Sequence, residues 1–494
     1  MKNIPVVKMG FVAVSRDCFE ISLSARRARG VLAELAKLGL ELTDAGLVVE
    51  NEKDMSQAVA TLKQAGCNAL VVYLGNFGPE APSTLFAKHF EGPVMYVAAA
   101  EERGDDLVNG RGDAYCGMLN CSYNLGLRKL KAVIPEYPIG SVEEIAEKVA
   151  EFLPVARALI GLSTLKVITF GPRPQDFFAC NAPLKGFYDL GIEVQENSEL
   201  DLLRAYQSHE GDSRIEAIAA DMANELGADG NQYPEMLPRM AQFELTLLDW
   251  MESNKGASEY VIFANKCWPA FPETFGFEPC YVNSRLASRG IPVGCEVDMY
   301  GALSEYIAAC ITQDAVTLLD INNTVPQDLY DEAIAGKYPY ALTDTFMGFH
   351  CGNTPMCKLS GGKLKYMLIQ NRLLEGGGEP DFTRGTLEGL LAAGDMTFFR
   401  LHGNADGSLQ AYIAQGEVLP VTVKSFGGIG VIAIPEMKRF YRHVLIEKRY
   451  PHHGAVAFGH IGKALYTLFR FLGIADVGFN QPKGMRYSTE NPFD

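Results

Sequence analysis

The N-terminal part of the chain alternates between short apolar runs and amphipathic helical patterns, and this alternation limits the possible folds more than any other feature. The apolar runs lie at 8–14, 68–74 and 93–99. Apolar residues at helical spacing, ended by a glycine, separate them in SLSARRARGVLAELAKLG and KDMSQAVATLKQAG. Strands and helices in this order predict a doubly wound parallel sheet with helices on both faces.

The same order recurs after a long helix expected at 142–160. The run LKVITFG predicts the first strand of a second α/β unit, and YVIFAN predicts a later strand. Helices are expected between these strands at 177–190, 213–226 and 234–254. We therefore expect a second doubly wound parallel-sheet domain.

After residue 342 the pattern changes, because helical periodicity thins and glycines crowd. Short alternating runs appear, among them GDMTFFRLHG, LQAYIAQG and YRHVLIEKRY. Regularly spaced short strands with glycine turns predict an antiparallel sheet or a small barrel. The expected fold class is α/β, with two doubly wound parallel-sheet domains at 1–163 and 164–342, followed by a β-rich, barrel-like C-terminal domain at 343–494.

Composition excludes several classes of partner. The formal net charge of −16 argues against nucleic acid and anionic membranes, since both polyanions need a basic footprint. No apolar run approaches the roughly 20 residues that a membrane span requires. The 11 cysteines are odd in number and scattered, and the N-terminal segment lacks the pattern of a secretory signal, so reduced thiols in a cytoplasm are expected. Small neutral ligands remain possible.

Two carboxylates, Glu296 and Asp320, lie in the stretch IPVGCEVDMYGALSEYIAACITQDAVTLLD at 291–320. This stretch predicts a short strand, an acidic turn, a helix at 300–311 and a second strand ending on Asp320. Strand, helix, strand order predicts parallel pairing, so both strands should finish side by side at one sheet edge. Ligands bind at that edge in open α/β sheets, and carboxylates suit Mg²⁺ or Mn²⁺. Two solvated turn acids are the alternative.

Four of the eight histidines lie at the two ends of the C-terminal domain: His350, His452, His453 and His460. For any one of them alone a structural role is the better interpretation. As a group they favour metal ligation by at least one, since neutral imidazole joins carboxylates readily around a transition metal. The C-terminal domain is thus expected to complete the site begun by the carboxylates.

Three further residues lie in loops that follow predicted strands. Arg16 and Asn76 belong to N-terminal loops that would meet a ligand approaching that domain; ordinary turn chemistry is the alternative. Trp268 follows the YVIFAN strand near the predicted carboxylate edge. Its ring is either a stacking face for a sugar or a packing residue.

These motifs resemble the L-fucose isomerase and L-arabinose isomerase family, most closely its fucose isomerase branch. GIPVGCEVDMYGAL resembles the family segment with the metal-binding glutamate, and the second carboxylate matches LLD ending at Asp320. PHHGAVAFGHIGKAL resembles the segment Asn-His-Gly followed by Tyr-Gly-His-Ile-Gly, which maps the third metal ligand onto His453. His452 stands where the family segment has asparagine.

The resemblance implies a metal-dependent aldose-ketose isomerase that acts on a free sugar, such as L-fucose, D-arabinose or L-arabinose, through a cis-enediol. Glu296 and Asp320 would serve both as ligands of Mn²⁺, Co²⁺ or Mg²⁺ and as the proton-transferring pair, with Glu296 the base at carbon. His453 would be a ligand only. His350 and Asn353 are candidates for contacts with sugar hydroxyls. The family also builds its pocket between subunits, which implies a homo-oligomer, expected to be a hexamer.

Two alternatives stay open at this point. A non-catalytic sugar-binding or sensor protein also pairs α/β domains. A metal-dependent sugar aldolase or hydrolase could use the same carboxylates.

Overall fold

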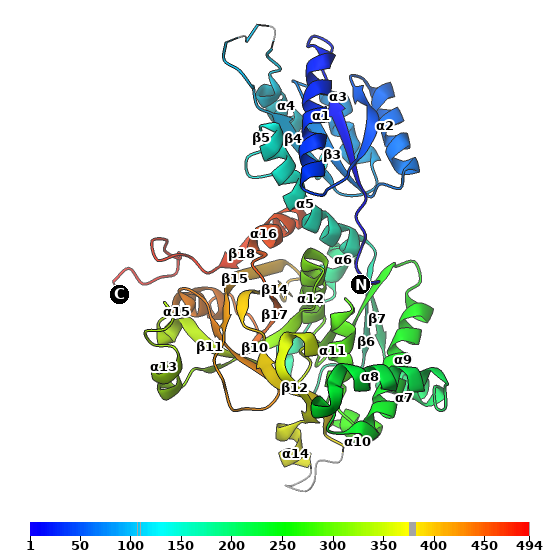
Figure 1. The fold of residues 1–494 in the computed structure, drawn as a ribbon, viewed down its shortest axis with the longest axis vertical. Coiled ribbons are helices and arrows are strands. Elements are labelled where there is room, and N and C mark those ends of the chain that lie inside the picture. Colours follow the sequence, from blue (N-terminus) through cyan, green and yellow to red (C-terminus); the bar gives the residue numbers. More distant parts are fainter. Residues whose placement is uncertain (106, 109, 375–381, 494) are drawn as a thin grey trace. The chain divides into compact units, whose positions relative to one another are not determined.

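The computed structural model describes residues 1–105, 107–108, 110–374 and 382–493. The chain divides into two compact units: residues 5–160 with 463–473, and residues 1–4 with 161–462 and 474–494. Figure 1 shows their helices and strands, and labels those for which there is room. None of the described helices is long and apolar enough to cross a membrane.

The smaller unit is built on a five-stranded parallel sheet, as the alternating pattern predicted. The strands lie in the order β2-β1-β3-β4-β5. Their bounds are β1 (Met9–Val14), β2 (Thr43–Val49), β3 (Ala69–Leu74), β4 (Val94–Ala99) and β5 (Ile139–Gly140). The helices are α1 (Ile21–Lys37), α2 (Glu52–Gln64), α3 (Glu80–His89), α4 (Ala114–Leu127), α5 (Val142–Ser163) and α16 (Gly462–Leu472).

The larger unit contains the second parallel sheet, which confirms the second doubly wound pattern. Its strands lie in the order β7-β6-β8-β9. Their bounds are β6 (Leu165–Phe170), β7 (Glu193–Asn197), β8 (Tyr260–Asn265) and β9 (Val293–Cys295). The helices are α6 (Lys185–Asp189), α7 (Glu199–Ser208), α8 (Arg214–Gly230), α9 (Leu237–Asn254), α10 (Ala270–Phe275), α11 (Cys280–Ser288) and α12 (Met299–Thr312).

The same unit holds the β-rich part, a nine-stranded mixed sheet in the order β12-β13-β16-β11-β10-β17-β14-β15-β18. A further pairing of β16 with β15 closes the strands between them into a barrel, as expected. The strands are β10 (Thr317–Thr324), β11 (Thr345–His350), β12 (Leu359–Tyr366), β13 (Arg384–Leu391), β14 (Gly394–Gly403), β15 (Leu409–Leu419), β16 (Gly428–Ala433), β17 (His453–Ala457) and β18 (Asp476–Phe479). Three helices accompany them: α13 (Gln327–Ala333), α14 (Leu368–Leu374) and α15 (Met437–Phe440).

One expectation for the stretch 291–320 was wrong. Strand β9 belongs to the parallel sheet, whereas β10 belongs to the barrel sheet and pairs antiparallel with β11 and β17. The reason lies in the helix between them, because α12 is buried on every side from Met299 to Ile311 and contacts strands of both sheets. A helix that is buried on all sides can pack between two sheets, whereas a crossover helix covers one face of a single sheet and exposes its other side.

Two local expectations were also wrong. The helix expected at 177–190 is reduced to a short 3-10 turn and α6, since Pro183 lacks the N–H that a continuous helix needs. The strand expected in YRHVLIEKRY is a π-helical turn at Tyr441–Ile446. Its buried residues, Val444 and Leu445, follow at helical spacing from the buried Phe440 that ends α15.

Candidate active site

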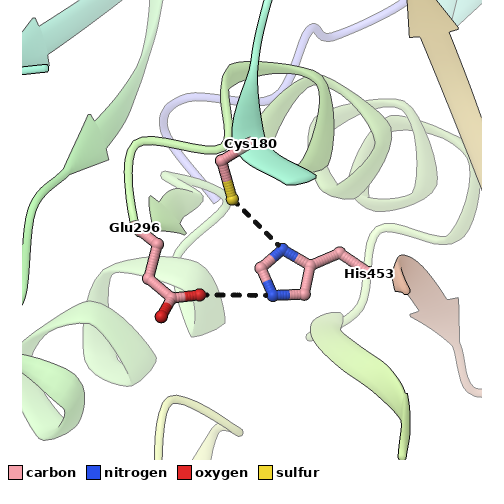
Figure 2. A group of neighbouring side chains, drawn as sticks. All are labelled: Cys180, Glu296 and His453. Atoms are coloured by element: carbon pink, nitrogen blue, oxygen red, sulfur yellow. Dashed lines mark hydrogen bonds and ion pairs between the residues drawn. The ribbon is translucent and has the colours of Figure 1, made fainter. Parts of the chain in front are cut away.

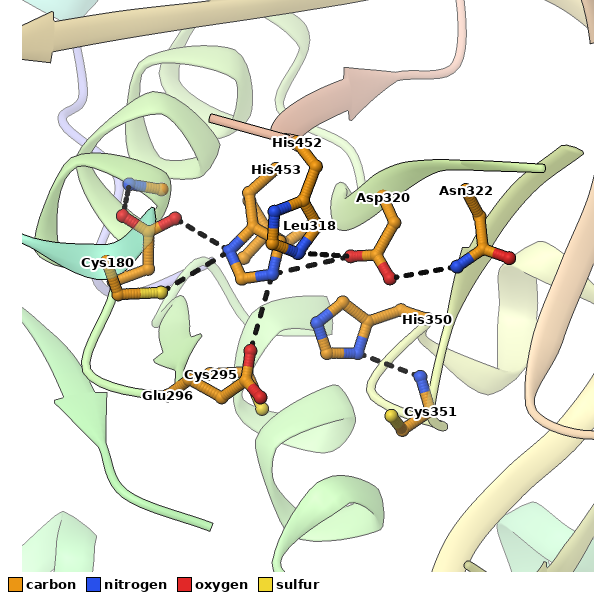
Figure 3. A network of polar contacts seen from close by, with 12 residues as sticks. Cys180, Cys295, Glu296, Leu318, Asp320, Asn322, His350, Cys351, His452 and His453 are labelled. Atoms are coloured by element: carbon orange, nitrogen blue, oxygen red, sulfur yellow. Dashed lines mark hydrogen bonds and ion pairs between the residues drawn. The ribbon is translucent and has the colours of Figure 1, made fainter. Parts of the chain in front are cut away.

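Strand pairing in the barrel brings the second carboxylate to the histidine. Strands β10 and β17 are antiparallel, and Asp320 lies directly opposite His453 in their register. Asp320 Oδ1 lies 3.3 Å from His453 Nε2, and Glu296 Oε2 lies 3.4 Å from the same nitrogen. Figure 3 shows both carboxylates pointing at this ring. The predicted ligands therefore meet, although through a different sheet arrangement than expected.

The other ring nitrogen of His453 is held by a buried ion pair. Nδ1 lies 2.9 Å from Asp298 Oδ2. The guanidinium of Arg400 binds both oxygens of Asp298, at 2.7 and 2.8 Å. All three side chains are buried. Because a carboxylate accepts, Nδ1 carries a proton; when the ring is neutral, the lone pair of Nε2 is therefore directed toward Glu296 and Asp320.

The electrostatics of this cluster favour ionised acids. Burial alone would raise the pKa of Asp298, but Arg400 and His453 more than offset this and hold it well below its usual range. Burial likewise acts against ionised Glu296, yet the His453 ring lowers the pKa of that carboxyl below its ordinary value. The pKa of His453 is raised well above 6.5, because Asp298, Cys180 and Glu296 outweigh burial. A cation that binds Nε2 must therefore displace a proton.

Backbone strain and an indole hydrogen bond fix the position of Glu296. Glu296 and Val297 have φ of +59° and +60°, in the left-handed region that a β-branched residue such as valine rarely adopts. Trp268 Nε1 donates to Glu296 Oε1 at 2.8 Å. Strain of this kind persists only where the surroundings enforce it, and it concentrates at functional sites. Trp268 therefore orients the Glu296 carboxylate, a role that the sequence did not indicate.

The donors near His453 form two groups that could hold a metal ion. One group is Cys180, Glu296 and His453, and the other is Asp320, His452 and His453. The set predicted from the sequence takes one carboxylate from each group. Figure 2 shows Cys180 and Glu296 at different nitrogens of the ring. The Cys180 sulfur lies 3.7 Å from Nδ1, the nitrogen that Asp298 already occupies.

The residues on the Nε2 side suit a hard divalent cation. Oxygen and imidazole ligands at about 2.1 Å from one ion lie about 3.0–3.4 Å from each other. The two carboxylate oxygens lie 3.3 and 3.4 Å from Nε2. Asp320 Oδ1 is buried and makes no hydrogen bond to any described residue. A buried carboxyl oxygen that accepts no hydrogen bond is an environment that a cation would complete.

Substituting Asp320 and Cys180 in turn should show which of the two groups of donors binds the ion. We expect Asp320→Asn to weaken Mn²⁺ binding by at least about 10- to 100-fold, the loss usual even for residues outside the ligand set. Cys180→Ser should leave Mn²⁺ affinity within about threefold, because its sulfur faces the nitrogen held by Asp298. Metal retained after dialysis and the rise of Tm with added Mn²⁺ measure both effects. If only Cys180→Ser lost Mn²⁺ binding, the ion would have to lie on the Nδ1 side of the ring.

His350 and Asn353 are both buried in the same unit. The backbone N–H of Cys351 donates to His350 Nδ1 at 2.9 Å, so the ring proton lies on Nε2, which has no partner among the described residues. Burial lowers the pKa of His350 and keeps the ring neutral. The ring centroid lies 5.6 Å from that of His453. His350 therefore presents an unused donor, and Asn353 Oδ1 is a buried acceptor without a described partner.

Arg16 and Asn76 belong to the smaller unit and lie in loops that follow β1 and β3. Asn76 is fully buried; its Oδ1 accepts from the backbone N–H of Arg16 and its Nδ2 donates to Ser15. Arg16 is partly exposed, stacks on Phe77 and lies 3.5 Å from Glu80. Asn76 thus shapes the loop that displays the Arg16 guanidinium.

Sequence reasoning assigned no role to Asp298, Arg400 or Phe177. Asp298 was visible only as an acid in the turn, and it also caps α12 by accepting from the Gly301 N–H. Arg400 could have been noticed as a charge at an alternating apolar position of GDMTFFRLHG. Phe177 packs its ring against Trp268, His452 and His453, at centroid distances of 6.3, 5.6 and 6.1 Å.

The loops that carry Phe177 and Trp268 follow β6 and β8, where the strand order of the parallel sheet reverses. Open α/β sheets bind ligands at this position, outside the carboxyl ends of the strands. Gly171 and Pro172 of the loop after β6, and Ala270 and Phe271 at the start of α10, line a neighbouring cavity of about 740 Å³, which none of Glu296, Asp320 and His453 lines. This volume is within the range of small-molecule sites.

Comparisons with known proteins agree with the motifs. The family model described as "Fucose/sulfoquinovose isomerase, N-terminal domain" matches residues 10–163, and "L-fucose isomerase, C-terminal domain" matches residues 348–478. Sulfoquinovose isomerases of Priestia aryabhattai and Priestia megaterium are each 25% identical over 351 residues, covering 68% of this chain and 70% of theirs. That of Clostridium sp. (strain MSTE9) is 25% identical over 313 residues, covering 61% of this chain and 62% of its own.

The second of these models spans β11 to β18 and includes His453, while the first spans the parallel sheet of the smaller unit. Together with the motifs around Glu296 and Asp320, they confirm the resemblance inferred from the sequence: this chain belongs to the fucose isomerase-like family.

Proposed function

We propose that this protein is a metal-dependent aldose-ketose isomerase that uses Glu296, Asp320 and His453 as its metal ligands. One observation carries the proposal: two carboxylates face the Nε2 of a buried imidazole whose Nδ1 is fixed by Asp298. A bound Mn²⁺, Co²⁺ or Mg²⁺ would act as a Lewis acid toward the carbonyl and hydroxyl oxygens of the sugar. The sugar isomerase class itself follows from the family.

The chemistry requires a proton to move between C1 and C2 of an open-chain sugar. Glu296 is the base we assign to carbon, because its pKa is low enough to leave it ionised and Trp268 holds one of its oxygens in place. Asp320 is its acid/base partner at the sugar oxygens. His350 Nε2 can donate to a sugar hydroxyl, and Asn353 Oδ1 can accept from one.

Arg173 indicates which charge the site would accept on a substrate. Its Nε is buried without a partner among the described residues, and its guanidinium stacks 4.3 Å above the ring of Phe178. The neighbouring Phe177 packs against His452 and His453. An unpaired guanidinium on a loop of the site suits an anionic group, and sulfoquinovose is a sulfonated sugar. We therefore include sulfonated sugars beside L-fucose, D-arabinose and L-arabinose as proposed substrates.

We also propose a homo-oligomer, expected to be a hexamer, in which N-terminal loops reach the site of another subunit. The partly exposed guanidinium of Arg16 on its Asn76-braced loop supports a role of this kind. If subunits exchange, a mixture of Arg16→Ala and Glu296→Gln subunits should regain activity that neither variant has alone.

Isotope exchange tests the reaction directly. The Mn²⁺-loaded protein is incubated in D₂O with neutral aldoses and with sulfoquinovose, and NMR follows deuterium at C1 and C2. We expect ketose of unchanged composition with solvent label at these carbons, and exhaustive chelation should abolish both signals. Binding without label would instead indicate a sensor, and fragments or hydrolysis products would indicate an aldolase or hydrolase.

A further inference from the structure

Helix α4 of the smaller unit carries a row of large apolar side chains on its exposed face. Tyr115, Leu119, Tyr123 and Leu127 are 62%, 64%, 65% and 61% exposed. Residues four apart share one helix face, so the four form a continuous row, which we call the α4 row. The helix has no charged residue from Ala114 to Leu127, although charged residues make up 21% of the chain.

Exposed apolar surface of this extent is unusual on a protein that functions alone. Buried aromatic side chains each cover about 150–250 Å², so four large side chains exposed by about three-fifths present roughly 400–500 Å². Single exposed apolar residues need no explanation, whereas contiguous patches of a few hundred Å² mark interaction sites. The α4 row is therefore a surface that a partner covers.

We propose that the partner is a second copy of this chain, with its own α4 packed antiparallel across a two-fold axis. A two-fold axis between the second and third members of the row places Leu119 against Tyr123 of the partner subunit. The same axis places Tyr115 against Leu127 of the partner subunit. Every aromatic ring then meets an aliphatic side chain, so the alternating order of the row is self-complementary. Parallel packing would instead set like side chains against each other.

The charges at the two ends of α4 favour the same antiparallel orientation. Asp113 immediately precedes the helix, and Arg128 and Lys129 immediately follow it. Asp113 is paired with Arg111, so its own contribution is partly screened. Antiparallel packing nevertheless brings each basic end to the end that carries the acid, and it also opposes the two helix dipoles.

The area of the row alone comes close to what a specific contact requires. Two facing copies would bury roughly 800–1,000 Å² from the row alone, close to the lower limit of about 1,000–1,200 Å² for biological interfaces. This inference is independent of the isomerase chemistry, since all its residues lie outside the proposed catalytic groups.

Sedimentation velocity of the full chain over a range of concentrations tests the proposal. We expect Leu119→Lys and Tyr123→Glu each to remove one association step, with the dissociation constant raised at least about tenfold. Mixing the two variants should restore association, because antiparallel packing places the introduced lysine of one subunit opposite the introduced glutamate of the other. Leu38→Lys, at a 53% exposed leucine just beyond α1, is the matched control and should assemble like the parent.

Circular dichroism and Tm establish that each variant folds, and amide hydrogen exchange of α4 in the parent gives a second readout that needs no variant. Concentration-dependent protection of α4 supports the interface. Unchanged assembly in both folded variants would overturn the proposal, as would a monomeric parent or association that the mixture does not restore. Protection of α4 in a monomer would show that other parts of the same chain cover the row.

Discussion

Glu296→Gln is expected to lower the isomerisation rate by about 10²- to 10⁴-fold, and added Mn²⁺ should not restore it. The substitution keeps the shape of the side chain and one neutral oxygen, but it removes the basic oxygen that faces His453 Nε2. Loss of the proton acceptor raises the barrier of the chemical step, which metal concentration does not change. Exchange of the carbon-bound hydrogen with solvent under metal saturation measures this step alone.

His453→Ala provides the contrast. It deletes one neutral ligand, so the main loss should be in metal affinity, and excess Mn²⁺ should recover part of the rate by mass action. Trp268→Phe provides a milder control, because it keeps both carboxylates and removes the hydrogen bond to Glu296 together with part of the ring that packs against Phe177. Near-parental exchange by metal-saturated Glu296→Gln would exclude Glu296 as the base and make Asp320 the first candidate.

Each of Glu296, Asp320 and His453 lies in a local motif, which is why their meeting could be predicted from the sequence. The strand patterns also predicted two parallel sheets and a β-rich barrel correctly. The route by which Asp320 reaches the site could not be predicted, because strand order alone does not say whether β9 and β10 share a sheet. That choice depends on α12, whose burial on all sides is set by the barrel packed against it.

Helix α4 and strand β2 were absent from the sequence-based description. The row of exposed Tyr and Leu side chains on α4 obscures the amphipathic pattern on which helix prediction depends, since both faces of the helix are apolar. Strand β2 has the pattern TDAGLVV, in which a glycine and an aspartate interrupt the apolar run. A helix face that a partner would cover, such as the α4 row, carries apolar residues where a surface helix is normally polar. The amphipathic pattern used for helix prediction is then lost.

The Asp298–Arg400 pair could not be found from spacing, since the two residues lie 102 positions apart. Neither is expected to touch substrate, and their role depends on where His453 places its Nδ1. Asp298→Asn should therefore lower Mn²⁺ affinity by about 10- to 100-fold, because an amide can present its N–H to Nδ1 and shift the ring proton onto Nε2. Removing one partner of the same buried pair should also lower stability, because the other charge is then left buried and uncompensated.

Arg400→Met is expected to destabilise the larger unit by about 3–5 kcal/mol at neutral pH, because it leaves Asp298 buried and ionised without its guanidinium. Urea unfolding followed by tryptophan fluorescence measures this loss. The chain has two tryptophans, Trp250 and Trp268, and both lie in the unit that contains Arg400.

The pH dependence of the stability of Arg400→Met distinguishes an uncompensated buried charge on Asp298 from a packing defect. Folding holds the pKa of Asp298 below its unfolded value, so the ion pair stabilises the protein above about pH 4 and this contribution is lost as the pH falls. In Arg400→Met the buried carboxyl can take up a proton, so the difference from the parent should shrink in acid. Adding Asp298→Asn to Arg400→Met should recover much of the loss at neutral pH, since the charge is then removed from both partners. A deficit that is equal at pH 4 and pH 7, and that persists in the double variant, would mean that Arg400 contributes through the packing of its side chain rather than through its charge.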